Sequence, residues 1–242
     1  LMNLPELRLN LFELIKDSEF AAKSYFAGGC VRDFLLSSNV AINSDVDICV
    51  ELPGGGIALA HYLQNLLPAS KLVIHKRFGT ASLNFNNFQL DFVATRKEQY
   101  VADNRYPQIQ FGTLWDDVLR RDFTINALLM SIATGEILDL CGKGLCDLKN
   151  GLIRTVQNPD KSFTEDPLRM LRAVQFALRF NFNIEEKTLQ ALQTNANALR
   201  ILSKSSIHKE LHKIPDAKKD KAKQLINSLG WEKYLKSETV NS

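Results

Sequence analysis

The chain has 242 residues, of which 45% are hydrophobic and 24% are charged, and its formal net charge is +3. These proportions are those of an ordinary soluble globular protein, folded as one large domain or two small ones. The sequence shows no apolar run of about 18 residues and no charged, apolar leader, so we expect neither a membrane span nor a secretory signal.

The apolar spacing predicts a helix over residues 4–20. A short strand, a Gly-Gly turn and a second helix are predicted in SYFAGGCVRDFLL (24–36). The strand SDVDICV (44–50), a glycine-rich break at 53–56 and a helix over 57–67 follow. Three further runs have the β-branched and aromatic content of strands in a mixed or antiparallel sheet; they are KLVIHKR (71–77), TASLNF (80–85) and QLDFVAT (89–95).

Residues 97–113 are polar and lack periodicity, which predicts a long functional loop. The sequence then becomes helical in texture over DDVLRRDFTINALLMSI (116–132), and a hairpin is expected around GEILDLCGKG (135–144). From about residue 160 to the end the pattern is almost entirely helical. A boundary between a strand-containing front and a helical rear is therefore expected near residues 140–155.

Two aspartates lie two positions apart in SDVDICV. Side chains of a strand alternate between its faces, so Asp45 and Asp47 point the same way. Like charges at this range raise each other's pKa unless a cation lies between them, and a divalent metal ion is the obvious candidate. The alternative is a polar strand end whose aspartates only face solvent.

A Gly-Gly turn precedes the second helix. Gly28 and Gly29 allow a tight turn and a close approach to a ligand, the helix start presents N–H groups, and Arg32 adds a positive charge. This arrangement suits a phosphate group, although glycine pairs before helices are also common for structural reasons. A triphosphate beside two carboxylates would suit metal-assisted in-line phosphoryl transfer.

Six segments together resemble the class II tRNA nucleotidyltransferases, the enzymes that build or finish the 3′ CCA end of tRNA, a group that includes bacterial poly(A) polymerases. The resemblance covers residues 22–212. The segments, in order, are GGCVRD (28–33), SDVDICV (44–50), RFGTASL (77–83), LDFVATRKEQY (90–100), LRRDFTINAL (119–128) and EDPLRMLRAVQFALRFNF (165–182).

The resemblance implies an α+β fold, with a polymerase-β-like nucleotidyltransferase head over residues 1–145. This head would hold a small mixed sheet with helices. An all-helical neck with a nucleotide-selecting helix would follow over 146–215, and a short basic helical remnant of the body over 216–242. The last part belongs to a lysine-rich stretch from Lys204 to Lys236, which suggests a polyanionic partner or simply a solvated helix face.

The resemblance also assigns roles in the front part. Asp45 and Asp47 would hold Mg²⁺, with Asp91 either the third catalytic carboxylate or only an aspartate near a strand end. The nucleotide's phosphates and ribose would be bound by Gly28, Gly29, Arg32, Arg121, Asp122 and Asn126. The segment from Asp122 also reads as a core helix capped by Asp122, with Ile125, Leu128 and Leu129 buried, and both readings are compatible.

A helix beginning near Asp166 would choose the base. Asp166 and Arg169 are three residues apart and offer an acceptor and a forked donor, which match the amino group and ring acceptor of cytosine or adenine. Arg172 continues this polar face. The structural alternative is that Asp166, before Pro167, is a helix cap.

We therefore expect a template-independent enzyme that adds CMP, AMP or both from CTP and ATP to the tRNA 3′ end, with release of pyrophosphate. The alternatives are a poly(A) polymerase, which the run KRFGTASL disfavours, and a non-catalytic RNA- or nucleotide-binding module. The expected partners are tRNA, CTP and ATP, with no membrane and with a homodimer as an option. The sequence departs from the family pattern at Gln175 and at Ser205-Ser206, and only about thirty residues follow Lys213, so we expect incomplete body and tail domains.

The four cysteines include no CxxC pair, which fits a reducing compartment. We expect the cytoplasm, with the mitochondrial matrix as the alternative. A zinc site would have to combine two cysteines with two histidines of the rear part, and their spacing does not match the usual zinc patterns; the four residues are Cys141, Cys146, His208 and His212.

Overall fold

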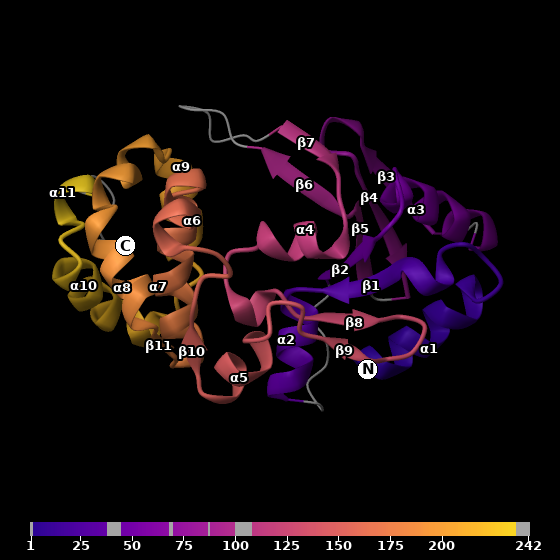
Figure 1. Ribbon diagram of the computed structural model, residues 1–242, viewed down its shortest axis with the longest axis horizontal. Coiled ribbons are helices and arrows are strands. Elements are labelled where there is room, and N and C mark those ends of the chain that lie inside the picture. The colour runs from indigo at the N-terminus through magenta and orange to yellow at the C-terminus, as the bar shows by residue number, and fades with distance from the viewer. Residues whose placement is uncertain (1, 38–44, 68–69, 87, 100–107, 236–242) are drawn as a thin grey trace. The chain divides into compact units, whose positions relative to one another are not determined.

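The computed structural model describes residues 2–37, 45–67, 70–86, 88–99 and 108–235 (Figure 1). Contacts divide the described chain into two compact units. The first unit runs to Leu145 without Asp122–Thr124, and the second contains Asp122–Thr124 and the residues from Cys146 onward. No helix in the described ranges is long and apolar enough to cross a membrane.

The first unit is built on a seven-stranded sheet with the order β3-β4-β5-β2-β1-β8-β9. Its strands are β1 (Ser24–Ala27), β2 (Asp45–Val50), β3 (Leu72–His75), β4 (Thr80–Phe85), β5 (Phe88–Ala94), β8 (Leu129–Ser131) and β9 (Ile137–Leu138). The helices are α1 (Leu4–Ile15), α2 (Gly29–Leu36), α3 (Gly55–Leu66) and α4 (Leu114–Leu119). Only β2 and β5 pair in parallel, so the sheet is mixed, as the sequence predicts.

Alternation along the strands divides the sheet into an apolar face and a polar face. The apolar side chains are fully buried, among them Val46, Ile48, Ala81, Leu83, Leu90 and Phe92. Helix α3 packs against β2, β4 and β5, and it lies along this part of the sheet in Figure 1. The polar face carries the aspartates of β2 and β5, of which Asp45 and Asp47 are exposed and Asp91 is half-buried.

In helix α1 the spacing of the apolar residues correctly predicted the helix and its start, but not its end. Four buried residues recur at helical spacing, namely Leu4, Leu7, Leu11 and Ile15. A capping box between Asn3 and Glu6 fixes the start of the helix. The helix ends at Ile15, five residues before the predicted end, because a turn follows at Lys16.

Two sequence predictions in this unit were wrong. Part of the expected loop 97–113 forms a hairpin of β6 (Arg96–Gln99) and β7 (Gln108–Phe111), while residues 100–107 lie outside the described ranges. The expected helix 116–132 is broken into α4, a 3₁₀ turn at Thr124–Asn126 and strand β8. Its apolar residues Ile125, Leu128 and Leu129 are buried as expected, but in a turn and a strand.

In its described residues the second unit is helical apart from an isolated bridge between Phe123 and Thr155 and one pair of two-residue strands, β10 (Leu152–Ile153) and β11 (Asn183–Ile184), which run parallel. Helix α5 (Gly144–Lys149) crosses the boundary between the units, and the later helices are α6 (Pro159–Glu165), α7 (Leu168–Phe180), α8 (Glu186–Thr194), α9 (Lys204–Leu211), α10 (Lys219–Ser228) and α11 (Glu232–Leu235). Helix α7 is the most buried of them and packs against α6, α9 and α10. Trp231 is fully buried and its indole N–H donates to the carbonyl of Leu192 at 3.0 Å.

Candidate functional site

Three carboxylates share the polar face of the first unit. Asp45 and Asp47 both lie exposed on β2, with Val46 buried between them on the other face. Asp91 lies in the middle of β5, directly opposite Asp47 in the parallel register. The strand geometry therefore brings together two aspartates from one strand and one from its neighbour, as the sequence predicted for their placement.

Asp91 is held by its neighbours. The hydroxyl of Ser82 on β4 donates to Asp91 Oδ1 at 2.5 Å, and the amide of Gln89 donates to both carboxylate oxygens at 3.2 Å. Ser82 Oγ in turn lies 3.2 Å from His75 Nε2 on β3. These contacts fix the orientation of Asp91, and neither Ser82 nor His75 was singled out by the sequence.

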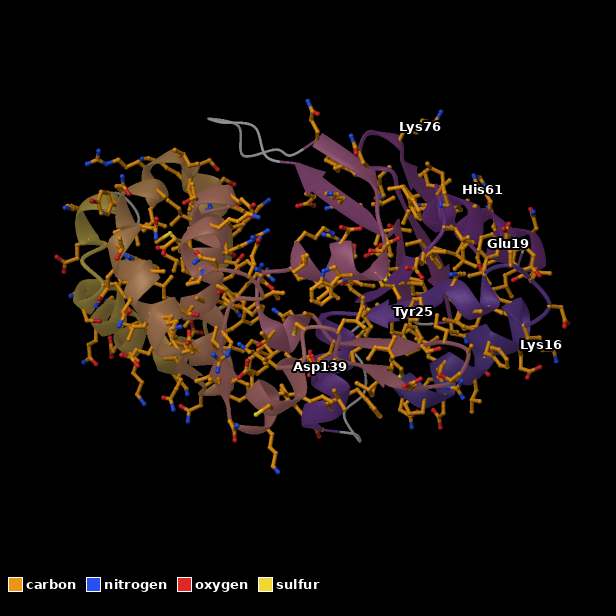
Figure 2. All side chains as sticks on the ribbon, in the orientation of Figure 1. Lys16, Glu19, Tyr25, His61, Lys76 and Asp139 are labelled. Carbon is orange, nitrogen blue, oxygen red and sulfur yellow. The ribbon has the colours of Figure 1, made fainter. Side chains whose placement is uncertain are left out.

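A pocket of about 410 Å³ opens beside these carboxylates on the β3–β5 side of the sheet. Its lining combines two of the three carboxylates, the hydrogen-bonded residues around Asp91 and two phenylalanines; the residues are Asp47, His75, Phe78, Thr80, Ser82, Gln89, Asp91, Phe92 and Val93. Phe78 is 59% exposed and ends the 3₁₀ turn between β3 and β4, which begins at Lys76, labelled in Figure 2. The pocket thus offers both hydrogen-bonding groups and an aromatic surface.

On the opposite side of β2, a glycine makes the turn into α2. Gly28 has φ of +72°, which side-chain-bearing residues rarely adopt. A Cβ at this position would lie 3.1 Å from Nη1 of Arg121 and 3.8 Å from Oδ2 of Asp47. Glycine is therefore required both by the backbone conformation and by the close approach of the Arg121 guanidinium.

Arg121 is held firmly in this position. Its Nη2 and Nε donate to Asp117 Oδ2 at 2.8 and 3.2 Å, and its Nη1 donates to the carbonyl of Asn126 at 3.3 Å. Asp117 is fully buried and also accepts from Arg120 at 2.6 Å. Sequence reasoning missed Asp117, although its position four residues before Arg121, in a segment predicted to be helical, was a usable signal.

Arg32 and Asn126 are also brought together. Arg32 Nη1 donates to Asn126 Oδ1 at 2.5 Å, and its Nε donates to Asp33 at 2.8 Å. Arg32 is 4% exposed, so its side chain is part of the floor beneath the glycine turn. Together with Arg121, it supplies positive charge on the β1 side of the aspartate pair.

The electrostatics of the site favour a bound cation. Desolvation by the surrounding sheet raises the pKa of Asp47 even though its side chain keeps solvent contact. Arg121 opposes this effect, whereas the carboxylates of Asp91 and Asp45 add to it. A group whose ionised form is penalised by neighbouring negative charge gains most from a cation placed among those charges.

The donor set fits a hard divalent ion. Carboxylate oxygens are the ligands that Mg²⁺ prefers, and it usually takes only one or two of them, together with water and substrate phosphates. Asp45 and Asp47 provide such a pair. Over the described ranges no three His, Cys, Asp or Glu residues form a complete metal site, so the remaining ligands would come from water and the nucleotide.

The other predicted residues lie in the second unit. Asp122 is buried and accepts at 2.6 Å from Nε of Arg172, whose guanidinium also lies over the Phe176 ring. This pair links the start of the unit to α7. The opposing charge of Asp122 raises the pKa of Arg172, against the effect of its burial.

Asp166 and Arg169 differ from their predicted arrangement. Asp166 precedes α7 in extended backbone and its Oδ1 accepts from the N–H of Leu168 at 3.1 Å, so it is not on a face of that helix. Arg169 is 5% exposed and donates to Ser162 Oγ at 3.0 Å, with Glu165 at 3.6 Å. Asp166 therefore caps the first N–H of α7, as the structural alternative predicted, although it lies one residue before the N-cap position.

Residues 24–154 match the model of the poly A polymerase head domain. The chain belongs to this family. It is 37% identical to a CCA-adding enzyme of Lactobacillus helveticus over 87% of the chain and 51% of that protein. It is 39% identical to an A-adding tRNA nucleotidyltransferase of Aquifex aeolicus over 72% of the chain and 20% of that protein.

Among solved structures, the chain is similar to a tRNA nucleotidyltransferase complexed with a primer tRNA and an incoming ATP analog. The TM-score is 0.77 at 30% identity, over 94% of the chain and 62% of that protein. The chain thus spans about half of the length of the CCA-adding relative and less than two thirds of the solved one. The α+β fold expected from the sequence agrees with this likeness.

Proposed function

We propose that the chain is a template-independent RNA nucleotidyltransferase that adds CMP, AMP or both to the 3′ end of tRNA. The 3′ oxygen of the RNA forms a bond to the α-phosphorus of CTP or ATP, and the bond to the leaving pyrophosphate breaks. The observation that carries the proposal is the placement of Asp45 and Asp47 beside the Gly28 turn and Arg121. The names of the relatives support tRNA as the substrate.

The chain's own residues suggest how the triphosphate is oriented. Arg121 and Arg32 place positive charge on the β1 side of β2, and the glycine turn leaves room for a phosphate to approach the backbone. We assign the leaving pyrophosphate to this side. Mg²⁺ bound by Asp45 and Asp47 would supply charge stabilisation for the transferring phosphoryl group.

In-line displacement requires the attacking oxygen to approach from the side opposite the leaving group. In this sheet that side is β5 and β4, where the pocket holds Asp91, Ser82 and Phe78. We assign the 3′ hydroxyl of the RNA to the neighbourhood of Asp91, which is positioned to accept its proton, and the terminal base to the ring of Phe78. Aromatic rings bind unpaired bases by stacking.

Base selection is assigned to the second unit. We propose that Asp166, Arg169 and Arg172 read the Watson–Crick edge of the incoming base, as the family resemblance implies. The present contacts of Arg169 with Ser162 and Glu165 would have to rearrange for this role. The expected effect of Asp166→Ala is a smaller preference between CTP and ATP with unchanged metal dependence.

The decisive experiment is incorporation of radiolabelled CMP and AMP into tRNA ending at the discriminator base, in C, or in CC. We expect extension of at least one of these RNAs and little extension of a poly(A) primer. Asp47→Asn should abolish extension without unfolding the protein. Efficient extension of poly(A) would support the poly(A) polymerase alternative, and no extension of any RNA would support the binding module.

We also propose a cellular compartment, a mode of RNA binding and an oligomeric state for the protein. The four cysteines are free in the structure, which supports a reducing compartment, and we propose the cytoplasm. The lysines of the second unit provide a non-specific grip on RNA phosphates, for which log affinity falls steeply with log salt. A titration of tRNA binding against salt, with sedimentation analysis of the oligomeric state, tests both the grip and the homodimer.

A further inference from the structure

Two histidines at the C-terminal end of α9 face each other at the surface of the second unit, His208 in the last turn and His212 as the C-cap residue. His208 and His212 are four residues apart and therefore lie on one side of the helix. Their Nε2 atoms are 2.8 Å apart and their ring centroids 4.0 Å apart. Both side chains are exposed, and neither is part of the sheet site or of the predicted base-reading residues.

This geometry is close to that of a metal chelate. Imidazole nitrogens bind transition metals at about 2.0–2.1 Å, so two of them at right angles on one ion would be about 3 Å apart. The observed separation of 2.8 Å is close to this value, and binding of one ion requires both rings to carry their proton on Nδ1 and to turn the Nε2 lone pairs toward the ion. In the metal-free state a hydrogen bond from the N–H of one imidazole to the nitrogen of the other accounts for the short distance between them.

The surroundings do not compete for the two nitrogens. The nearest acidic residue on the helix, Glu210, is buried and accepts at 2.8 Å from Lys213 on the next turn. Neither cysteine of the zinc pattern weighed from the sequence completes the pair: Cys141 contacts Asp139 and Cys146 contacts Asn150. In the described part of the chain no third His, Cys, Asp or Glu joins the two histidines in a cluster.

We propose that His208 and His212 form a two-point chelate for a borderline transition-metal ion, of the class Cu²⁺, Ni²⁺ or Zn²⁺, with water in the remaining positions. Imidazole suits these ions, whereas Mg²⁺ prefers oxygen ligands. The chelate is therefore chemically distinct from the aspartate pair of the first unit. Because both ligands are correctly placed only when α9 is folded, the metal stabilises this helix.

The test uses the full 242-residue chain with one equivalent of Cu²⁺ and no nucleotide. Electron paramagnetic resonance should show coupling to two nitrogens in the wild type. His208→Gln and His212→Gln should each lose one nitrogen and weaken Ni²⁺ binding in calorimetry by roughly tenfold or more, because removal of a direct ligand costs at least as much as removal of a residue that only supports one. Thermal unfolding without metal confirms that each variant is folded.

A matched control comes from another exposed histidine on a helix, His61 on α3, which Figure 2 labels. His61→Gln should keep both nitrogen couplings and the wild-type affinity. Oxygen-only coordination in the wild type, or unchanged spectra in His208→Gln and His212→Gln, would overturn the proposal.

Discussion

Asp47 and Asp91 lie directly opposite each other in the parallel pair of β2 and β5. Parallel pairing is unusual in this sheet, since every other neighbouring pair runs antiparallel. The pairing places carboxylates of two strands on one open face, while the residues on either side of Asp47, Val46 and Ile48, are fully buried on the other. The chemistry of the proposed site therefore depends on the register of a single strand pair.

The first prediction concerns the ion pairs of Asp117. Burial alone would raise the pKa of Asp117, but the charges and hydrogen bonds of Arg120 and Arg121 outweigh it, so the pKa lies below its ordinary value. The ion pairs of Asp117 therefore contribute their full stabilisation at pH values above the unfolded-state pKa of about 3.9. This stabilisation is lost as the pH falls from there through the lower pKa that Asp117 has in the folded protein.

Asp117→Ala should lower the free energy of unfolding at pH 7 by about 3–5 kcal/mol, because two arginines lose their buried partner. The loss relative to wild type should shrink near pH 3. Urea titrations at both pH values measure it, with Asp17→Asn on the exposed surface as the control. An equal loss at both pH values would show that Asp117 does not act through its charge.

The second prediction concerns the orientation of Asp91. Ser82→Ala removes the hydroxyl that donates to Asp91 at 2.5 Å, whereas Ser82→Thr keeps a hydroxyl there. We expect Ser82→Ala to lower kcat by roughly tenfold, the usual effect of losing a supporting hydrogen bond, with little change in the KM for CTP. Thr should restore most of the rate. If both variants lose the same activity, the packing of the side chain rather than its hydroxyl is responsible.

The third prediction concerns Phe78. If its ring stacks on the terminal base of the RNA, Phe78→Ala should raise the KM for tRNA by about tenfold, since stacking on one base contributes about 1–3 kcal/mol. Phe78→Tyr should behave as the wild type, and the KM for nucleotides should not change in either variant. A change confined to the nucleotide KM would place the incoming nucleotide, not the RNA, over this ring.

The fourth prediction concerns stability in the second unit. Gln175 on α7 and Glu210 on α9 each bury one polar atom without a hydrogen-bond partner, Nε2 and Oε1 respectively. Gln175→Met removes the unpaired amide at similar volume and should raise the free energy of unfolding by about 1 kcal/mol. The same change at the exposed Gln193 is the control. Loss of stability in Gln175→Met would mean that water satisfies the amide.

The sequence predicted best what short-range patterns determine. The same-face placement of Asp45 and Asp47 follows from strand alternation alone, and the Gly28 turn from glycine's tolerance of positive φ. The segment 116–132 was misread because apolar residues recur at helical spacing in it. The chain instead leaves the helix after Leu119 and pairs β8 with β1, a long-range contact that local propensity does not encode.

The supporting residues were harder to find for the same reason. Ser82 and His75 reach Asp91 across three neighbouring strands, so their role depends on sheet order rather than on spacing along the chain. Only the expected position of Asp166, on one face of a helix with Arg169, differs in the structure. Pro167 disfavours a helical conformation in the residue before it, and Asp166 is accordingly extended.

The most direct test of the account is a crystal structure of the chain with Mg²⁺ and a non-hydrolysable CTP or ATP analogue. We predict an ion bound by carboxylate oxygens of Asp45 and Asp47, with the triphosphate over the Gly28 turn and beside Arg121. A nucleotide bound elsewhere, with both aspartates turned away from any metal ion, would contradict the proposed site.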